Sequence, residues 1–144
     1  MRIRSTRRAA RPSALCAVTE TSYVPGDGPK NIFPVFTVAN GLTCKMSIYS
    51  GGTIACGGKL PGVSNGDNEV FVEFAGPAGT RKAEAPPKPT YPGPVKQLPA
   101  GQKVYTYGAT CMATQDGGVA CMGGGVAPQG FLVTSTNTTT FGGR

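Results

Sequence analysis

The feature that most constrains the fold is a pair of similar segments, each holding two cysteines and several glycines. The first segment covers residues 41–58 and the second covers residues 108–123. Both contain G-x-T-C, then a variable stretch, then G-G and, shortly after, an apolar residue followed by A-C. Runs rich in β-branched and aromatic residues, which favour strands, lie on either side of each segment. The sequence therefore predicts an internal repeat of one β unit.

The first segment forms a β-hairpin when Cys44 is placed opposite Cys56. The turn then consists of Tyr49, Ser50 and Gly51. A glycine in third place suits the three-residue loop whose last residue has a positive φ. Because side chains alternate along a strand, this register also puts both cysteines and the large apolar side chains on one face, with polar side chains on the other.

The second segment behaves in the same way. When Cys111 lies opposite Cys121, the turn consists of Gln115, Asp116 and Gly117, again with glycine in third place. Directly opposed cysteines on antiparallel strands are close enough for a disulfide. Each bridge would close a loop of about a dozen residues and stabilise the fold by about 3 kcal/mol in the chain-entropy model. We therefore predict a small all-β, antiparallel protein with two repeated, disulfide-closed hairpins.

Three other roles for the four cysteines are open alternatives. Zinc ribbons and knuckles hold cysteines about two to four residues apart, whereas eleven and nine residues separate the members of the two pairs, and the chain has no His. A redox-active pair usually takes the form C-x-x-C, which does not occur. Free structural thiols would suit a cytosolic protein. The disulfide interpretation instead predicts an extracellular or cell-envelope protein with no metal and no cofactor.

The positive charge is concentrated at the N-terminus. The net charge is +7, but five arginines lie in the first eleven residues, which hold no acidic residue, so the remaining 133 residues carry +2. We expect residues 1–22 to be a basic, disordered arm or a truncated signal region, because their apolar stretch is short for an export signal. Twin-arginine and lipoprotein signals, the latter at Cys16, are matched only in part. A nearly neutral body argues against a nucleic-acid partner.

We expect a single β domain over residues 23–144, made of two units at about 31–75 and 102–141. Seven of the 13 prolines lie in the linker between them, residues 76–101. This linker should therefore be extended or disordered and stay out of the sheet interior. Units of about 50 residues are small to fold alone, so we expect them to pack together in a monomer. No apolar run is long enough for a transmembrane segment.

Residues able to catalyse a reaction are few. Without His, the commonest general base and the usual Ser or Cys triads are missing. Asp67, Glu69 and Glu73 are the candidate catalytic carboxylates, but Glu69 and Glu73 would lie about 13 Å apart along one strand, too far for the paired acids of a glycosidase. Residues 65–69 could bind calcium, although they are first a turn rich in Asn, Gly and Asp. The sequence favours a non-enzymatic protein, with a carboxylate-dependent hydrolase as the alternative.

The two hairpins are followed by Gly130-Phe131-Leu132-Val133-Thr134 and by a threonine-rich run, residues 134–141, which suits a half-exposed strand. Together these features resemble small uncharacterised exported proteins of mycobacteria and related actinobacteria. The resemblance covers about residues 35–141. It implies a secreted or cell-envelope location and no catalytic residues.

We accordingly expect a β module that binds a protein or glycan partner. Loops on a rigid scaffold carry most recognition. The expected contacts are therefore the two hairpin tips, at Tyr49 and Ser50 in one copy and at Gln115 and Asp116 in the other, together with the proline-rich linker.

Overall fold

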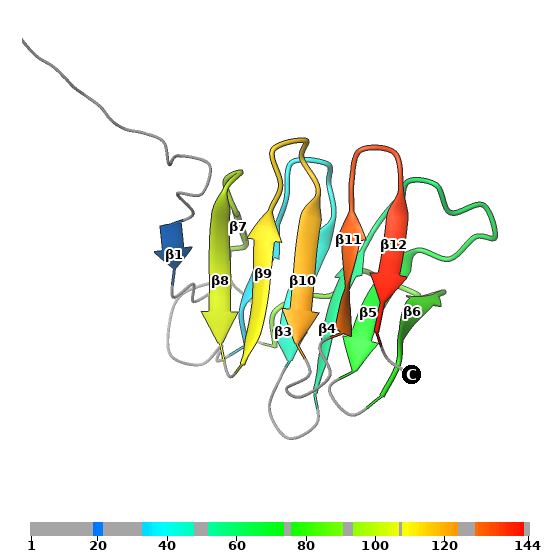
Figure 1. The fold of residues 1–144 in the computed structure, drawn as a ribbon, viewed down its shortest axis with the longest axis horizontal. Coiled ribbons are helices and arrows are strands. Elements are labelled where there is room, and N and C mark those ends of the chain that lie inside the picture. The colour runs from blue at the N-terminus through cyan, green and yellow to red at the C-terminus, as the bar shows by residue number, and fades with distance from the viewer. Residues whose placement is uncertain are drawn as a thin grey trace, which may run out of the picture.

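All regular structure in the described part of the chain is β-strand, arranged in two six-stranded sheets. The sheets lie one in front of the other in Figure 1. The predicted all-β fold class is therefore confirmed. No helix among the described residues is long and apolar enough to cross a membrane. This computed structural model describes residues 19–21, 33–47, 52–73, 76–90, 94–106, 108–123 and 129–142.

The sheet nearer the viewer in Figure 1, which we call the front sheet, has the strand order β1-β8-β9-β10-β11-β12. Its neighbouring strands are antiparallel except for the parallel pair β1 and β8. Its strands are β1 (Thr19–Thr21), β8 (Gln102–Thr106), β9 (Ala109–Ala113), β10 (Val119–Gly123), β11 (Gln129–Val133) and β12 (Thr138–Phe141).

The other sheet, which we call the back sheet, has the order β7-β2-β3-β4-β5-β6. Its neighbours are again antiparallel except for one parallel pair, β7 and β2. Its strands are β2 (Val35–Thr37), β3 (Thr43–Ser47), β4 (Thr53–Gly57), β5 (Glu69–Glu73), β6 (Ala78–Arg81) and β7 (Lys96–Gln97).

The two sheets are built in the same way, and they exchange one strand. Strands β2 to β6 follow one another as antiparallel neighbours, and β8 to β12 do the same. The short strand before each five-stranded unit joins the other unit: β1 precedes β2 in the chain but pairs with β8, and β7 precedes β8 but pairs with β2. Each sheet therefore contains a strand that is covalently attached to the other unit. This correspondence supports the internal repeat, which stays a prediction.

The hairpin registers expected from the sequence are confirmed. Each cysteine pair lies directly opposite across its ribbon. Disulfides join Cys44 to Cys56 and Cys111 to Cys121, and the Cα atoms are 4.0 Å apart in both pairs. Gly117 has a φ of 91°, as the three-residue turn requires.

One apolar core fills the space between the sheets. The side chains that face inward from both sheets form a single cluster, which includes both disulfides. Its largest members are Phe36 from the back sheet and Phe131 from the front sheet, and both are fully buried. Burying a side chain of this kind contributes about 1.5–3 kcal/mol. The described parts of the two units therefore pack around one core.

The linker agrees in part with the expectation, and two other segments differ from it. The linker, residues 76–101, contains β6 and β7, which are edge strands free of proline, so it does stay out of the sheet interior. Residues 134–141 do not form one strand, because Thr134 N donates to Asn137 O at 2.8 Å and closes a turn between β11 and β12. Residues 19–21, expected to belong to a disordered arm, pair with the edge of β8. Main-chain hydrogen bonds allow an extended segment of almost any sequence to pair there.

Candidate functional site

The candidate carboxylate Glu69 is held by an ion pair within the back sheet. Arg81 lies directly opposite it on β6, and its Nε donates to Glu69 Oε2 at 2.7 Å. The guanidinium carbon of Arg81 also lies 4.1 Å from the centre of the Phe71 ring. Only 7% of Glu69 is exposed. Its carboxylate therefore joins two neighbouring strands and is poorly placed to meet a substrate.

The structure does not bring the other two candidate carboxylates to Glu69. Asp67 Oδ2 accepts a hydrogen bond from the Thr80 hydroxyl at 2.7 Å, and Asn65 Oδ1 accepts one from Asp67 N at 2.9 Å. Residues 65–67 thus form the turn expected from their composition. Glu73 lies at the opposite end of β5 from Glu69. Within the described residues, no group of three or more His, Cys, Asp or Glu side chains could hold a metal ion.

Of the two expected hairpin tips, the one at Gln115 and Asp116 lies among the described residues, and residues 49–50 lie outside them. Asp116 accepts hydrogen bonds from the Thr114 hydroxyl at 2.6 Å and from Ser135 N at 2.9 Å. These bonds lower the pKa of the Asp116 carboxyl, and the bond from Thr114 has the largest effect. Asp116 therefore ties its own turn to the turn between β11 and β12.

The outer face of the front sheet is a candidate site that the sequence analysis missed. Every large apolar side chain that is exposed in the described part of the chain lies on this face, with exposed fractions between 37% and 54%. Half-buried Met112 extends the patch across β9. A contiguous apolar patch marks an interaction site far more often than scattered apolar residues do. The four exposed side chains are Tyr105, Met122, Leu132 and Phe141.

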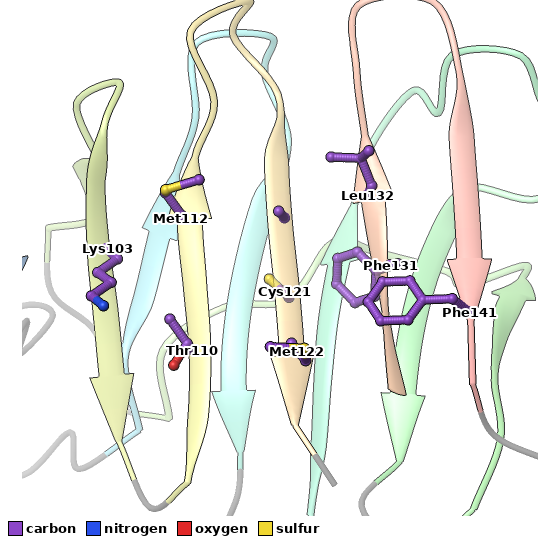
Figure 2. Close-up of a pocket in the computed structure, with 9 residues that line it drawn as sticks. Lys103, Thr110, Met112, Cys121, Met122, Phe131, Leu132 and Phe141 are labelled. Carbon is purple, nitrogen blue, oxygen red and sulfur yellow. The ribbon is translucent and has the colours of Figure 1, made fainter. Parts of the chain in front are cut away.

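A shallow hollow of about 410 Å³ lies on this face, over β8 to β12. Figure 2 shows the side chains of Met112, Leu132 and Phe141 around it, with Lys103 at the β8 side. Gly130 lies directly opposite Phe141, and a Cβ added at Gly130 would lie 3.0 Å from the Phe141 ring. Because Gly130 has no side chain, the Phe141 ring can lie over β11.

The equivalent face of the back sheet is covered by the proline-rich linker. Lys45 Nζ donates to the Thr90 hydroxyl at 3.2 Å, and partial burial lowers the pKa of Lys45. A Cβ added at Gly57 would lie 2.8 Å from Pro87 Cδ and 3.2 Å from Pro86 Cα. The linker thus crosses this face on its way from β6, at one edge of the back sheet, to β7 at the other.

One signal in the sequence could have identified the apolar face. In the second hairpin the face opposite the cysteines carries Met112, Thr114 and Ala120, whereas the first hairpin carries Lys45, Ser47, Thr53 and Ala55 there, so the clearest difference is Met112 in place of Lys45. A strand that is apolar on both faces is typical of one covered on both sides. The comparison of the two copies therefore already distinguished their outer faces.

The fold defines a two-layer β-sandwich with two disulfide-closed hairpins and an exposed apolar face. Two buried disulfides are compatible with an oxidising, extracellular environment. Comparison with models of protein families, with curated proteins and with solved structures finds no match. The function is therefore inferred from the chemistry of the two outer faces.

Proposed function

We propose that this protein is a non-enzymatic β module, secreted or held in the cell envelope, that binds a protein partner on the outer face of its front sheet. The observation that carries the proposal is the gathering of all exposed large apolar side chains of the described residues on this one face. Removing such a patch from water supplies about 25 cal/mol for each Å² of apolar surface that a partner covers.

The composition of the face favours a polypeptide over a glycan. Two methionines, whose flexible thioether side chains adapt to varied partners, lie beside Leu132 and Phe141, and the polar groups that line the hollow are confined to Lys103 and Thr110. A glycan presents many hydroxyl groups, which would lose hydrogen bonds to water without gaining partners here. The back sheet shows that an outer face of this architecture can hold an extended, proline-rich chain.

The proposed contact surface replaces the one expected from the loops. Residues 86–90 of the linker already contact the back sheet through Pro86, Pro87 and Thr90. At the Gln115–Asp116 tip, the carboxylate of Asp116 is used within the chain. These two regions therefore take part in the fold, and residues 49–50 lie outside the described residues. Among the described surfaces, the outer face of the front sheet is the one that we propose for a partner.

The hydrolase considered from the sequence is not proposed. Two of its three candidate carboxylates are engaged within the chain, Glu69 by Arg81 and Asp67 by Thr80, and Glu73 lies at the other end of β5 from Glu69. The secreted or cell-envelope location is supported by the two buried disulfides, because such bridges persist in oxidising compartments and reinforce small cores.

The proposal is tested with a panel of fluorescein-labelled synthetic 12-residue peptides that combine proline with Leu or Ala. Fluorescence anisotropy should detect binding to the full chain, and Met122→Lys should weaken it at least about tenfold, because it places a charge in the apolar face. Gln115→Lys makes the same charge change on an exposed tip and should leave affinity unchanged. The proposal is wrong if no peptide binds, or if Met122→Lys and Gln115→Lys have the same effect. A signal from a glycan array that survives Met122→Lys would also contradict it.

A further inference from the structure

Met122 carries the most exposed sulfur in the part of the chain that the structure describes. The exposed fraction of this residue is 47%. Met112 is half-buried, and Met46 is fully buried in the core. The remaining methionine, Met1, lies outside the described residues. Among the described thioethers, that of Met122 is therefore the one that a solute reaches most easily.

The cysteines of the described residues do not compete with Met122 for an oxidant. All four are joined in disulfides, and each is at most 1% exposed. Susceptibility of cysteine to oxidation follows thiolate character and exposure, and a buried disulfide has neither. A mild oxidant that approaches the described sulfur atoms from solvent therefore meets Met122 first.

Met122 belongs to a row of outer side chains that crosses the front sheet. It lies opposite Thr110 on β9 and opposite Gly130 on β11. Gly130 in turn lies opposite Phe141 on β12. A Cβ added at Gly130 would lie 3.0 Å from Met122 Cα and 3.0 Å from the Phe141 ring, so the glycine leaves open space between the two large side chains. Both side chains line the apolar hollow (Figure 2).

The surroundings of Met122 suit a thioether better than a sulfoxide. Oxidation converts this flexible, apolar side chain into a polar one whose oxygen accepts hydrogen bonds. The polar side chains that line the hollow are confined to Lys103 and Thr110. A partner that covers the face with apolar groups would take the sulfoxide oxygen away from water, and the lost hydrogen bonds count against binding. Oxidation of Met122 should therefore weaken the hold of such a partner.

The described part of the back sheet has no methionine on its outer face. Gly57 takes there the place of Met122, directly after the second cysteine of its hairpin, and Lys45 takes the place of Met112. The methionine that the back sheet does contain, Met46, faces the core. Mild oxidation should therefore change the outer face of the front sheet and leave the core as it is.

We propose that Met122 is a modification site, at which hydrogen peroxide converts the thioether into a sulfoxide and so lowers the affinity of the outer face for its partner. The sulfur attacks one peroxide oxygen, and an S–O bond forms as the O–O bond breaks. The proton of the transferred oxygen passes to the other oxygen, which leaves as water. Sulfur loses the two electrons that the peroxide gains, and methionine sulfoxide reductases reverse the change. The loss of affinity rests on the proposed function, whereas the modification itself does not.

Peptide mapping by mass spectrometry tests the modification in the full chain. After brief treatment with hydrogen peroxide, Met122 should be oxidised at least about threefold faster than half-buried Met112 and at least about tenfold faster than Met46, because exposure sets the rate. Protection of Met46 also reports that the fold is intact. The modification site is wrong if Met122 is oxidised no faster than Met112 while Met46 stays protected.

Fluorescence anisotropy tests the consequence for binding, with a labelled peptide that binds the untreated chain. Complete oxidation of Met122 should weaken binding at least about fivefold, and partial oxidation should weaken it in step with the sulfoxide fraction found by mapping. Treatment with methionine sulfoxide reductases should restore the affinity. Unchanged affinity after complete oxidation contradicts the regulatory step, as does a loss that persists when Met122 is reduced again.

Two matched variants assign the effect to one methionine. Met112→Leu and Met122→Leu both keep an apolar side chain at the altered position, and both retain Cys16, so any effect of oxidising that cysteine occurs in both. Each chain is compared with itself before and after peroxide. Met112→Leu should lose affinity on treatment as the unaltered chain does, whereas the affinity of Met122→Leu should not change on treatment. Equal losses in the two variants contradict the assignment to Met122.

The proposed function and the regulation of its site fail in different ways. If peptides bind the untreated chain and Met122→Lys weakens binding, but the sulfoxide has no effect, the regulatory step is wrong and the proposed function stands. If no peptide binds the untreated chain, the proposed function and the regulatory step are both wrong, and the peptide map alone decides whether Met122 is a modification site.

Discussion

The two sheets of this protein share strand order and inner faces but differ on their outer faces. Where the back sheet pairs Glu69 with Arg81, the front sheet places Gly130 opposite Phe141. Where the back sheet has Gly57, against which the linker packs, the front sheet has Met122, of which 47% is exposed.

The comparison of the two sheets distinguishes the inner faces, which hold the fold together, from the outer faces, which are available to a partner. Inward-facing side chains are constrained in both sheets, because they must fill one close-packed core. The outer faces carry no such constraint, so one can serve as a track for the linker and the other as a binding surface. Under the proposed function, recognition therefore depends on which outer face remains apolar.

The largest expected effect is the loss of stability when a disulfide is removed, and it tests whether the inner faces of the two sheets are equivalent. Replacing Cys44 and Cys56 together by Ala should lower the free energy of unfolding by about 3 kcal/mol, and replacing Cys111 and Cys121 should cost about the same, because the two loops are of similar length. Urea denaturation of each double variant gives the two values. A loss confined to one bridge would show that the sheets differ inside as well as outside.

A smaller effect should follow from making the back sheet resemble the front one. Gly57→Met would place a side chain where Pro86 and Pro87 now lie, and overpacking of this kind costs about 2 kcal/mol. If the substitution lowers the free energy of detaching the linker from the sheet by about 1.4 kcal/mol, the detached fraction rises roughly tenfold. Trypsin cleavage after Lys82 should then become roughly tenfold faster. The control, Met122→Gly, changes the front sheet and should leave cleavage after Lys82 unaltered. Equal cleavage in all three chains would mean that the linker does not depend on this contact.

The smallest expected effect concerns the front-sheet turn held by Asp116. The hydrogen bonds from Thr114 and Ser135 lower the pKa of this carboxyl, so they favour its charged form. Their contribution to stability should be present above the ordinary aspartate pKa of about 4 and be lost as pH falls through the lowered value. Asp116→Asn should therefore be less stable than the unaltered chain at pH 7 and closer to it at pH 2. Thermal unfolding at both pH values measures this, and a difference that does not change with pH would contradict it.

The hairpins could be predicted because their information is local. Alternation of apolar and polar residues, together with a glycine in third place of the turn, left one register for Cys111 and Cys121, and the structure has that register. The candidate site could not be predicted in the same way. Its side chains come from β8 to β12, and whether they are exposed depends on which outer face the linker crosses, which no local pattern records.

By itself, the sequence determined the strands of the two hairpins, the pairing of the cysteines and which hairpin side chains face the core, because each follows from the period of two along a strand and from short loops. The tertiary structure alone decided that β1 and β7 are exchanged between the sheets and that one outer face is covered while the other is apolar and exposed. The physical reason is that edge pairing relies on main-chain hydrogen bonds, which are nearly the same for every sequence, so only the complete arrangement of the chain selects the edge.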